Sequence, residues 1–411
     1  MSLIQFNLYF HMNVFSAGIT RKIVEILSTG HMCRQINLWE EEYMAAKVYF
    51  TDMRAGFNKS LLDKVEKLFD QAGMSTFIGR KDLVALKLHF GEKGNTGYIR
   101  PPFLRRIVNK VKGLGGRPFL TDANTLYFGS RSNAYDHLQT AIENGFAYAV
   151  VDAPLIIADG LAGKDFVNVE INRKHFKSVK IASAAYHADA IIALTHFKGH
   201  EITGFGGVLK NLGMGLGSRS GKQNMHSDVL PSVNPDKCTG CGRCGQWCPA
   251  EAISIREKIS HIDEKKCVGC GECTVTCPVH AIDVNWKTEP AAIQEKIVEY
   301  AEGALKNKKG KYGFITFLTN VSPACDCYGW SDASLVRDIG ILASRDPVAI
   351  DQACIDLVNR EKALPNTSLD GKTDVQDKFR SLYPDIDWKR QLAYAEEIGL
   401  GTRKYELIKF D

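Results

Sequence analysis

The feature that most constrains this chain is a cysteine pattern that occurs twice between residues 238 and 277. Eight of the twelve cysteines fall in this stretch, and each half reads C-x2-C-x2-C-x3-C-P. The second half follows the first at a constant offset of 29 residues, and the similarity continues into Pro249–Ile253 and Pro278–Ile282. The stretch is therefore an internal duplication.

The spacing of these cysteines predicts two [4Fe-4S] clusters. Three thiolates separated by two residues can bind one cubane, and in a duplicated pattern of this kind the fourth cysteine ligates the other cluster. The predicted ligand sets are Cys238, Cys241, Cys244 and Cys277 for the first cluster and Cys267, Cys270, Cys273 and Cys248 for the second. Zinc sites and disulfides are the alternatives, but zinc has no use for the third evenly spaced cysteine and the crossing fourth one. Clusters of this type carry single electrons, so the segment predicts electron transfer.

With every ligand present, this segment resembles a bacterial-type ferredoxin with two clusters. Residues 236–283 carry seven acidic and six basic side chains. The segment thus lacks the strongly acidic face by which many soluble ferredoxins bind partners, which favours electron transfer inside this protein or its complex.

Outside the segment, short apolar runs alternate with helical patterns, which predicts an α/β domain with a mostly parallel sheet and flanking helices. The expected strands are 47–51, 83–90, 118–121, 190–195, 313–318 and 339–343, and the expected helices are 60–72, 101–115 and one beginning at Pro347. We expect an N-terminal extension at 1–43, the two parts of the α/β domain at 44–230 and 287–411, and a small α+β ferredoxin-like domain at 231–286.

Overall composition is that of an ordinary globular chain, with 45% hydrophobic and 24% charged residues. The formal charge of +5 comes without a long basic run interleaved with aromatic residues, which argues against nucleic acid as a partner. No apolar stretch of membrane-spanning length occurs in the sequence, and metal-binding cysteines need reduced thiols. We therefore expect a cytoplasmic protein without a membrane span.

A glycine-rich segment after the strand at 190–195 is the first candidate site of the α/β domain. His196, Lys198 and His200 would share one face of an extended chain, and Lys210 and Asn211 add further donors. Cationic side chains and glycines beyond a strand end predict a pocket for an anion such as phosphate or carboxylate, although such glycines also make tight turns. Both histidines can equally be core or surface residues. Neither a P-loop nor a Rossmann fingerprint is present.

Two further candidates lie elsewhere in the chain. One is the polar set around the loop after the second strand, which surface polarity alone would also explain: Lys87, His89, Glu92, Lys93, Arg100, Asp122 and Asn124. The other is Cys325-Asp326-Cys327, which could chelate a metal, form a redox disulfide or do neither. Cys354 lies on an apolar helix face, which predicts a packed core residue.

Several stretches of the α/β domain together resemble the family named domain of unknown function 362, some members of which carry a ferredoxin segment. The resemblance covers residues of about 47 to 360 and rests on these stretches: 195–200, 203–204, 209–213, 323–327, 338–344 and 346–351. It implies the α/β architecture and the clusters, but no settled reaction.

These observations favour an iron–sulfur redox protein in which two [4Fe-4S] clusters pass single electrons. Its α/β domain would bind a small anionic ligand or dock a redox partner protein. One alternative is a ferredoxin-linked oxidoreductase that acts on a small anionic substrate, with His196, Lys198 or His200 as acid, base or anion-binding group. A second alternative is a binding or sensor module that the clusters stabilise.

Overall fold

The computed structural model describes residues 45–410 with the exception of 58, 128, 227–229, 249, 268–270, 284–288 and 372–374. The expected N-terminal extension at 1–43 and the predicted ligand Cys270 lie outside the described residues. Within the described ranges, no helix combines the length and the apolar character that crossing a lipid bilayer would need.

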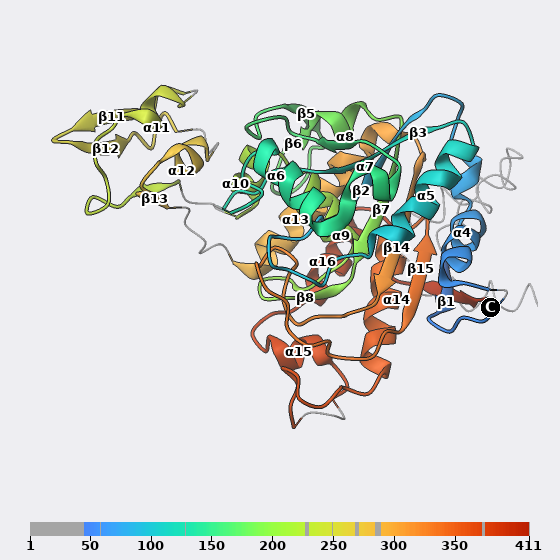
Figure 1. Ribbon diagram of the computed structural model, residues 1–411. Helices are drawn as coiled ribbons and strands as arrows, with labels where there is room; N and C mark the ends of the chain where they lie inside the picture. The colour runs from blue at the N-terminus through green and yellow to red at the C-terminus, as the bar shows by residue number, and fades with distance from the viewer. Residues whose placement is uncertain are drawn as a thin grey trace, which may run out of the picture. The chain divides into compact units, whose positions relative to one another are not determined.

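An eight-stranded sheet organises the α/β domain (Figure 1). Five of its seven neighbouring pairs are parallel, and β15 runs antiparallel to both of its neighbours, so the prediction of a mostly parallel sheet is confirmed. The sheet is built from both sides of the cysteine segment, because β14 pairs with β7. Across the sheet the strands are β16 (Tyr405–Lys409), β1 (Ala46–Asp52), β15 (Gly340–Ser344), β14 (Tyr312–Leu318), β7 (Ala190–His196), β2 (Leu83–Lys87), β3 (Arg117–Asp122) and β4 (Leu155–Ile157).

Both faces of the sheet are buried, which explains why its central strands read as continuous apolar runs. Along β7, Ile192 and Leu194 pack into one hydrophobic cluster, whereas Ile191 and Ala193 pack into another on the opposite face. Successive side chains of a strand point to opposite faces, so both clusters draw on the same strands.

Helices α4 and α5 cover one face, while α9, α13 and α14 cover the other (Figure 1). The helices of the α/β domain are α4 (Leu61–Gln71), α5 (Pro101–Gly113), α6 (Ala134–Ala141), α7 (Tyr148–Val151), α8 (Ser183–His187), α9 (Val208–Leu216), α10 (Arg219–His226), α13 (Pro290–Leu305), α14 (Pro347–Arg360), α15 (Lys378–Leu382) and α16 (Lys389–Glu397). Two short hairpins complete it: β5 (Phe166–Glu170) with β6 (Ser178–Ala182), and β8 (Lys198–His200) with β9 (Gly204–Gly206).

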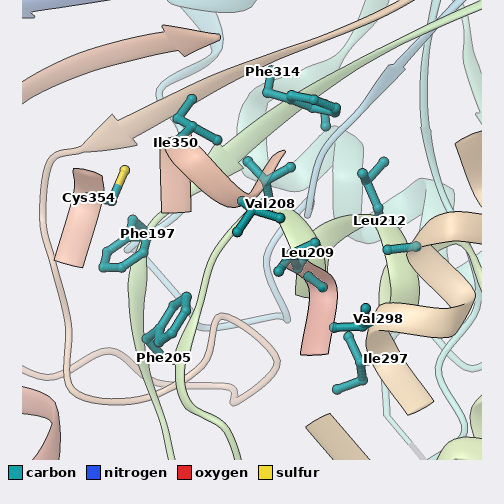
Figure 2. Packing of buried hydrophobic residues seen from close by; sticks show 14 of the residues in the cluster. Phe197, Phe205, Val208, Leu209, Leu212, Ile297, Val298, Phe314, Ile350 and Cys354 are labelled. Atoms are coloured by element: carbon teal, nitrogen blue, oxygen red, sulfur yellow. The ribbon is translucent and has the colours of Figure 1, made fainter. Parts of the chain in front are cut away.

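Helix α9 packs between the sheet and α13, and its side chains meet those of α13 in the core (Figure 2). A Cβ atom on Gly213 would collide with the carbonyl oxygen of Ile297, so glycine lets the two helices approach closely. Cys354 of α14 is fully buried in the same cluster, which confirms its prediction as a core residue (Figure 2).

The first turn of α9 is held by a carboxylate from another helix. Asp351 of α14 is fully buried, and its two oxygens accept the backbone N–H groups of Val208 at 2.7 Å and Leu209 at 3.0 Å. These N–H groups have no partner within their own helix, so the carboxyl satisfies them. Burial raises the pKa of Asp351 to about 7, although both hydrogen bonds oppose the shift.

The cysteine segment has the same local structure in both halves. Its elements are β10 (Ser232–Val233), α11 (Arg243–Gln246), β11 (Ile253–Arg256), β12 (Ile259–Ile262), α12 (Glu272–Thr276) and β13 (Ile282–Asp283). Helices α11 and α12 each follow a glycine with a left-handed backbone, with φ of 75° at Gly242 and 72° at Gly271. The sequence duplication is therefore also a structural one.

We expect Asp351→Asn to destabilise the fold by about 1–3 kcal/mol, because the amide group replaces one of two acceptors with a donor. The native carboxyl keeps its proton up to about pH 7, whereas in the unfolded chain it ionises near pH 4. Its contribution to stability is thus present below pH 4 and is lost as pH rises to 7. Urea unfolding at pH 5 and pH 7.5 should show this loss in the native chain and a smaller loss in the variant. Asp385→Asn, at an exposed position, is the control. The prediction would be contradicted if the free energy of unfolding had the same pH dependence in the native protein and in both variants.

Candidate functional site

Polar side chains from four strands converge on one cavity of about 470 Å³ beyond the carboxyl ends of the sheet. Lys87 and Asp122 end β2 and β3, and Lys198 follows β7. The loop after β14 contributes Cys325 and Cys327. The three candidates that the sequence suggested separately thus line a single cavity, to which His89, His200, Lys210 and Asn211 also contribute.

A buried ion pair forms one wall of the cavity. Lys87 Nζ lies 3.1 Å from Asp122 Oδ1 and donates to Asn211 Oδ1 at 2.8 Å, and both charged side chains are almost fully buried. Burial lowers the pKa of Lys87 despite the opposing carboxylate. Burial would raise the pKa of Asp122, but Lys87 and the neighbouring cationic groups outweigh it and hold that pKa well below its usual value. The Asp122 carboxylate is therefore held next to the Lys87 amine.

Asn211 itself fixes the geometry around this pair. Its Nδ2 donates to the carbonyl oxygen of Leu194 at 3.2 Å and to the hydroxyl of Thr195 at 3.0 Å. Because its amide is used in these bonds and in the bond from Lys87, Asn211 orients the lysine and joins α9 to β7.

Arg131 is a second buried cation of the wall, and the sequence analysis missed it. Its Nε donates to Glu92 Oε2 at 3.1 Å, and its Nη2 donates to the hydroxyl of Tyr127 at 2.6 Å. That hydroxyl in turn donates to the carbonyl oxygen of Cys327 at 3.1 Å. Arg131 lies in an irregular loop without a sequence pattern, and only its burial distinguishes it from surface arginines.

Asp326 holds the Cys325–Cys327 loop against the sheet. His196 Nδ1 lies 2.9 Å from Asp326 Oδ1, and Lys198 Nζ lies 2.9 Å from Asp326 Oδ2. Burial would raise the pKa of Asp326, but His196 and Lys198 outweigh it and hold that pKa well below its ordinary value. The other ring nitrogen of His196 contacts the carbonyl oxygen of Thr319 at 3.0 Å, so the imidazole is held at both ends and does not line the cavity.

The two cysteines of this loop differ in chemistry. Lys210 Nζ lies 3.4 Å from the sulfur of buried Cys325. A hydrogen bond from Cys327, with the charge of Lys210, lowers the pKa of Cys325 well below its usual value in spite of burial. The same hydrogen bond, together with burial, raises the pKa of Cys327 well above its usual value. The position of Lys210 thus favours negative charge on the sulfur of Cys325 over that of Cys327.

Lys222 of α10 lines the same cavity, and the pKa of its side chain is unusually low. Its Nζ donates to the carbonyl oxygen of Gly217 at 2.6 Å. Burial lowers the pKa of Lys222 to about 8, with Asp159 and Asp122 opposing the shift. Its charge therefore changes close to neutral pH.

Other predicted polar residues lie away from the cavity lining. Lys93 pairs with Glu143 at 3.1 Å on the surface, and largely exposed Arg100 lies 3.5 Å from Asp338. Asn124 donates to Asp159 Oδ1 at 2.9 Å and holds a loop. Surface or structural roles account for these three residues.

Strand pairing in the cysteine segment crosses between its halves. β10, which precedes Cys238, pairs with β13, which follows Cys277. β11, which follows Cys248, pairs with β12, which precedes Cys267. The two halves of the segment are therefore joined by strand pairs at both ends.

Several sulfurs of the segment lie near one another. The hydroxyl of Ser260 lies 3.6 Å from the sulfur of Cys238 and 3.2 Å from that of Cys244, and Cys244 packs in one cluster with Cys273 and Cys277. All cysteines that the structure describes are free of disulfides. As placed in the described ranges, which leave out Cys270, the His, Cys, Asp and Glu side chains form no group of three or more that could hold a metal ion.

The ferredoxin resemblance of this segment has a counterpart among curated proteins. A protein named "Probable ferredoxin" from Methanosarcina thermophila is 49% identical over 37 residues, which are 9% of this chain and 64% of that protein.

Two solved structures are similar to this chain at low identity. The lactate racemase apoprotein from Thermoanaerobacterium thermosaccharolyticum has a TM-score of 0.37 and 13% identity, and the match covers 77% of this chain and 58% of that one. A protein from Thermotoga maritima has a TM-score of 0.37 and 12% identity, with 75% and 61% covered. The chain thus spans less than two thirds of the length of each of the three relatives.

A family match covers most of the α/β domain. Residues 84–356, about two thirds of the chain, match the family described as "Domain of unknown function (DUF362)". The match includes the strands that carry Lys87, Asp122 and His196, the cysteine segment and the loop of Cys325 and Cys327. The chain therefore belongs to the DUF362 family.

Proposed function

We propose that this protein is an iron–sulfur redox protein in which two [4Fe-4S] clusters pass single electrons and the α/β domain binds a small anionic ligand. The observation that carries the proposal is the crossed pairing of β10 with β13 and of β11 with β12. The similarity to a ferredoxin over 37 residues supports it.

Crossed pairing supports the crossed ligand sets. The first cluster would be held by Cys238, Cys241, Cys244 and Cys277, and the second by Cys267, Cys270, Cys273 and Cys248. A chain that alternates in this way between two cubanes keeps them close together, as single-electron exchange between them requires.

The backbone around the sulfurs also suits thiolate ligands. The N–H of Ala252 donates to the sulfur of Cys248, and the N–H of Ala281 donates to that of Cys277, both at 3.2 Å. Hydrogen bonds to cysteine sulfur stabilise its negative charge and tune the potential of the cluster that it ligates.

An anionic ligand is supported by the charges around the cavity. Five lining residues carry cationic side chains, namely Lys87, Arg131, Lys198, Lys210 and Lys222, and two carry carboxylates, namely Asp122 and Glu201. Apolar side chains such as Leu126, Met214 and Ile293 complete the lining. Three of these cations are paired, Lys87 with Asp122, Arg131 with Glu92 and Lys198 with Asp326. Lys210 and Lys222 are therefore the lining cations that favour a carboxylate or phosphate, and the apolar part favours a ligand with a small hydrocarbon body.

The loop of Cys325 and Cys327 favours a second candidate function, an oxidoreductase that acts on the bound anion. Lys198 and His200 line the cavity, whereas His196 is held behind it by Asp326 and Thr319. Of the three predicted catalytic candidates, Lys198 and His200 are therefore placed to touch a ligand, and His196 positions the loop.

Paired substitutions test the clusters and their crossed ligation. In the full chain, purified and reconstituted without oxygen, we expect about eight irons per chain and a paramagnetic signal after dithionite. Cys241→Ala with Cys277→Ala should remove two ligands of one cluster and leave the other intact, at about four irons. Cys241→Ala with Cys248→Ala should remove one ligand from each cluster and leave no intact [4Fe-4S] signal.

Cys354→Ala is the control and should keep both clusters, because Cys354 is buried in the α/β core. An inverse pattern in the two double variants would show uncrossed ligation. A native chain that stays colourless after reconstitution, or that binds two zinc ions instead of iron, would refute the cluster proposal.

The anion site predicts a specific pH dependence. Lys222 carries its charge below about pH 8 and loses it above, because burial lowers its pKa. Calorimetric titration with sulfate should therefore give a dissociation constant that rises between pH 7 and pH 9, by about tenfold where one charge contact is lost. Lys222→Met should weaken binding at pH 7 and remove most of this pH dependence.

Lys112→Met is the matched control, since Lys112 of α5 pairs with Asp152 and does not line the cavity. Absence of sulfate binding, or an identical pH profile in the native chain and the Lys222 variant, would count against the anion site.

A further inference from the structure

The Cys325–Cys327 loop has a rigid frame that presents both sulfurs to the cavity. The N–H of Tyr328 donates to the carbonyl oxygen of Cys325 at 3.1 Å, which closes a tight turn. Asp326 between the cysteines is anchored by His196 and Lys198. The two thiol groups therefore point to the same side and line the cavity, while the residue between them points to the sheet.

The groups around the pair are arranged for sulfur chemistry. His200 Nδ1 accepts the backbone N–H groups of Ile202 at 3.2 Å and Thr203 at 3.3 Å, so the ring proton lies on Nε2. That imidazole and Lys210 both stabilise negative charge on Cys325. Two neighbouring cysteines with a lysine ammonium beside one of them make the arrangement of a reactive dithiol.

We propose that Cys325 and Cys327 form a redox-active dithiol that reduces a small anionic disulfide bound in the cavity. The cavity of about 470 Å³ has room for a small disulfide but not for a folded protein, and Lys210 and Lys222 in its lining favour acidic groups. Regeneration of the dithiol rests on the proposed electron transfer through the clusters.

The reaction is a thiol–disulfide exchange. The Cys325 thiolate attacks one sulfur of the substrate and the substrate S–S bond breaks. One substrate thiolate departs, and the other half of the substrate stays bound to Cys325 as a mixed disulfide. Cys327 gives its proton to that thiolate and attacks the sulfur of Cys325, which releases the second substrate thiolate. Two electrons pass from the dithiol to the substrate, and an S–S bond joins Cys325 to Cys327.

The return step needs two electrons, which the two proposed clusters, held by the eight cysteines of residues 238–277, would supply. Each [4Fe-4S] centre would supply one electron, and two electrons with one proton from solvent would convert the disulfide back to the Cys325 thiolate and the Cys327 thiol.

The test uses the full chain with its clusters and two small disulfides as probes, without oxygen. 3,3′-Dithiodipropionate carries two carboxylates, and cystamine carries two ammonium groups. After incubation, free thiols are blocked with N-ethylmaleimide and the protein is digested with trypsin. Mass spectrometry then gives the mass of the peptide Tyr312–Arg337, which contains only these two cysteines. We expect the peptide to lose both blocking groups and to contain an internal disulfide, about tenfold faster with the anionic probe than with cystamine.

Single variants separate the two roles. Cys327→Ser should accumulate a mixed disulfide on Cys325, and Cys325→Ser should react at least about tenfold more slowly because the remaining thiol lacks the contact with Lys210. Cys354 lies in another tryptic peptide, Asp346–Arg360, and should stay blocked as the internal control.

Two results would overturn the proposal: a 312–337 peptide that keeps both blocking groups with either probe, or equal rates with the anionic and the cationic disulfide. Iron content and the dithionite signal of the same samples report on the clusters separately. Intact clusters with an unreactive pair would thus refute the dithiol alone, whereas a reactive pair without clusters would refute only its supply of electrons.

Discussion

The buried carboxylate of Asp326 is the interaction on which the cavity depends. A carboxylate without exposure to water is costly unless charged partners surround it, and His196 and Lys198 supply those partners at 2.9 Å each. Because both partners come from the chain that leaves β7, the contact ties the loop after β14 to the neighbouring strand end. Loss of either partner would leave a buried charge, so the position of Cys325 and Cys327 depends on the same contact.

Charge balance around the cavity separates groups that hold the structure from groups that can meet a ligand. Lys87 and Arg131 are matched by Asp122 and Glu92 within the wall. Lys210 contacts the sulfur of Cys325, and its charge would become available to a ligand if that sulfur entered the proposed disulfide. The proposed anion binding and the proposed oxidation of the cysteines would then be linked through one lysine, since oxidation of the pair would strengthen the positive field that the ligand meets.

Much of this architecture could be predicted from the sequence, for identifiable reasons. Strands such as β7 and β14 are buried on both faces, so their apolar runs were visible, and Pro347 after Asp346 marked the start of α14. The strand predicted at 83–90 is shorter in the structure and ends at Lys87, where the chain enters the wall of the cavity. The cysteine duplication was visible because ligand spacing is a local property of the chain.

The site itself depended on long-range contacts that no local pattern contains. Arg131 is joined to Glu92, and Asp351 caps a helix that lies far before it in the sequence. Convergence of Lys87, Lys198 and the Cys325 loop follows from the strand order, in which β14, β7, β2 and β3 are neighbours although distant segments separate them in the chain.

The chain connections of the cysteine segment bear on how the one-electron and two-electron parts of the proposed chemistry are joined. The cysteine segment leaves the α/β domain after α10 and returns before α13, and these two helices contribute Lys222 and Ile293 to the cavity lining. Both connections of the segment therefore start from elements of the cavity wall. Two one-electron centres, as proposed, would match a dithiol that needs two electrons, because each cluster would then change by a single charge for every disulfide that is reduced.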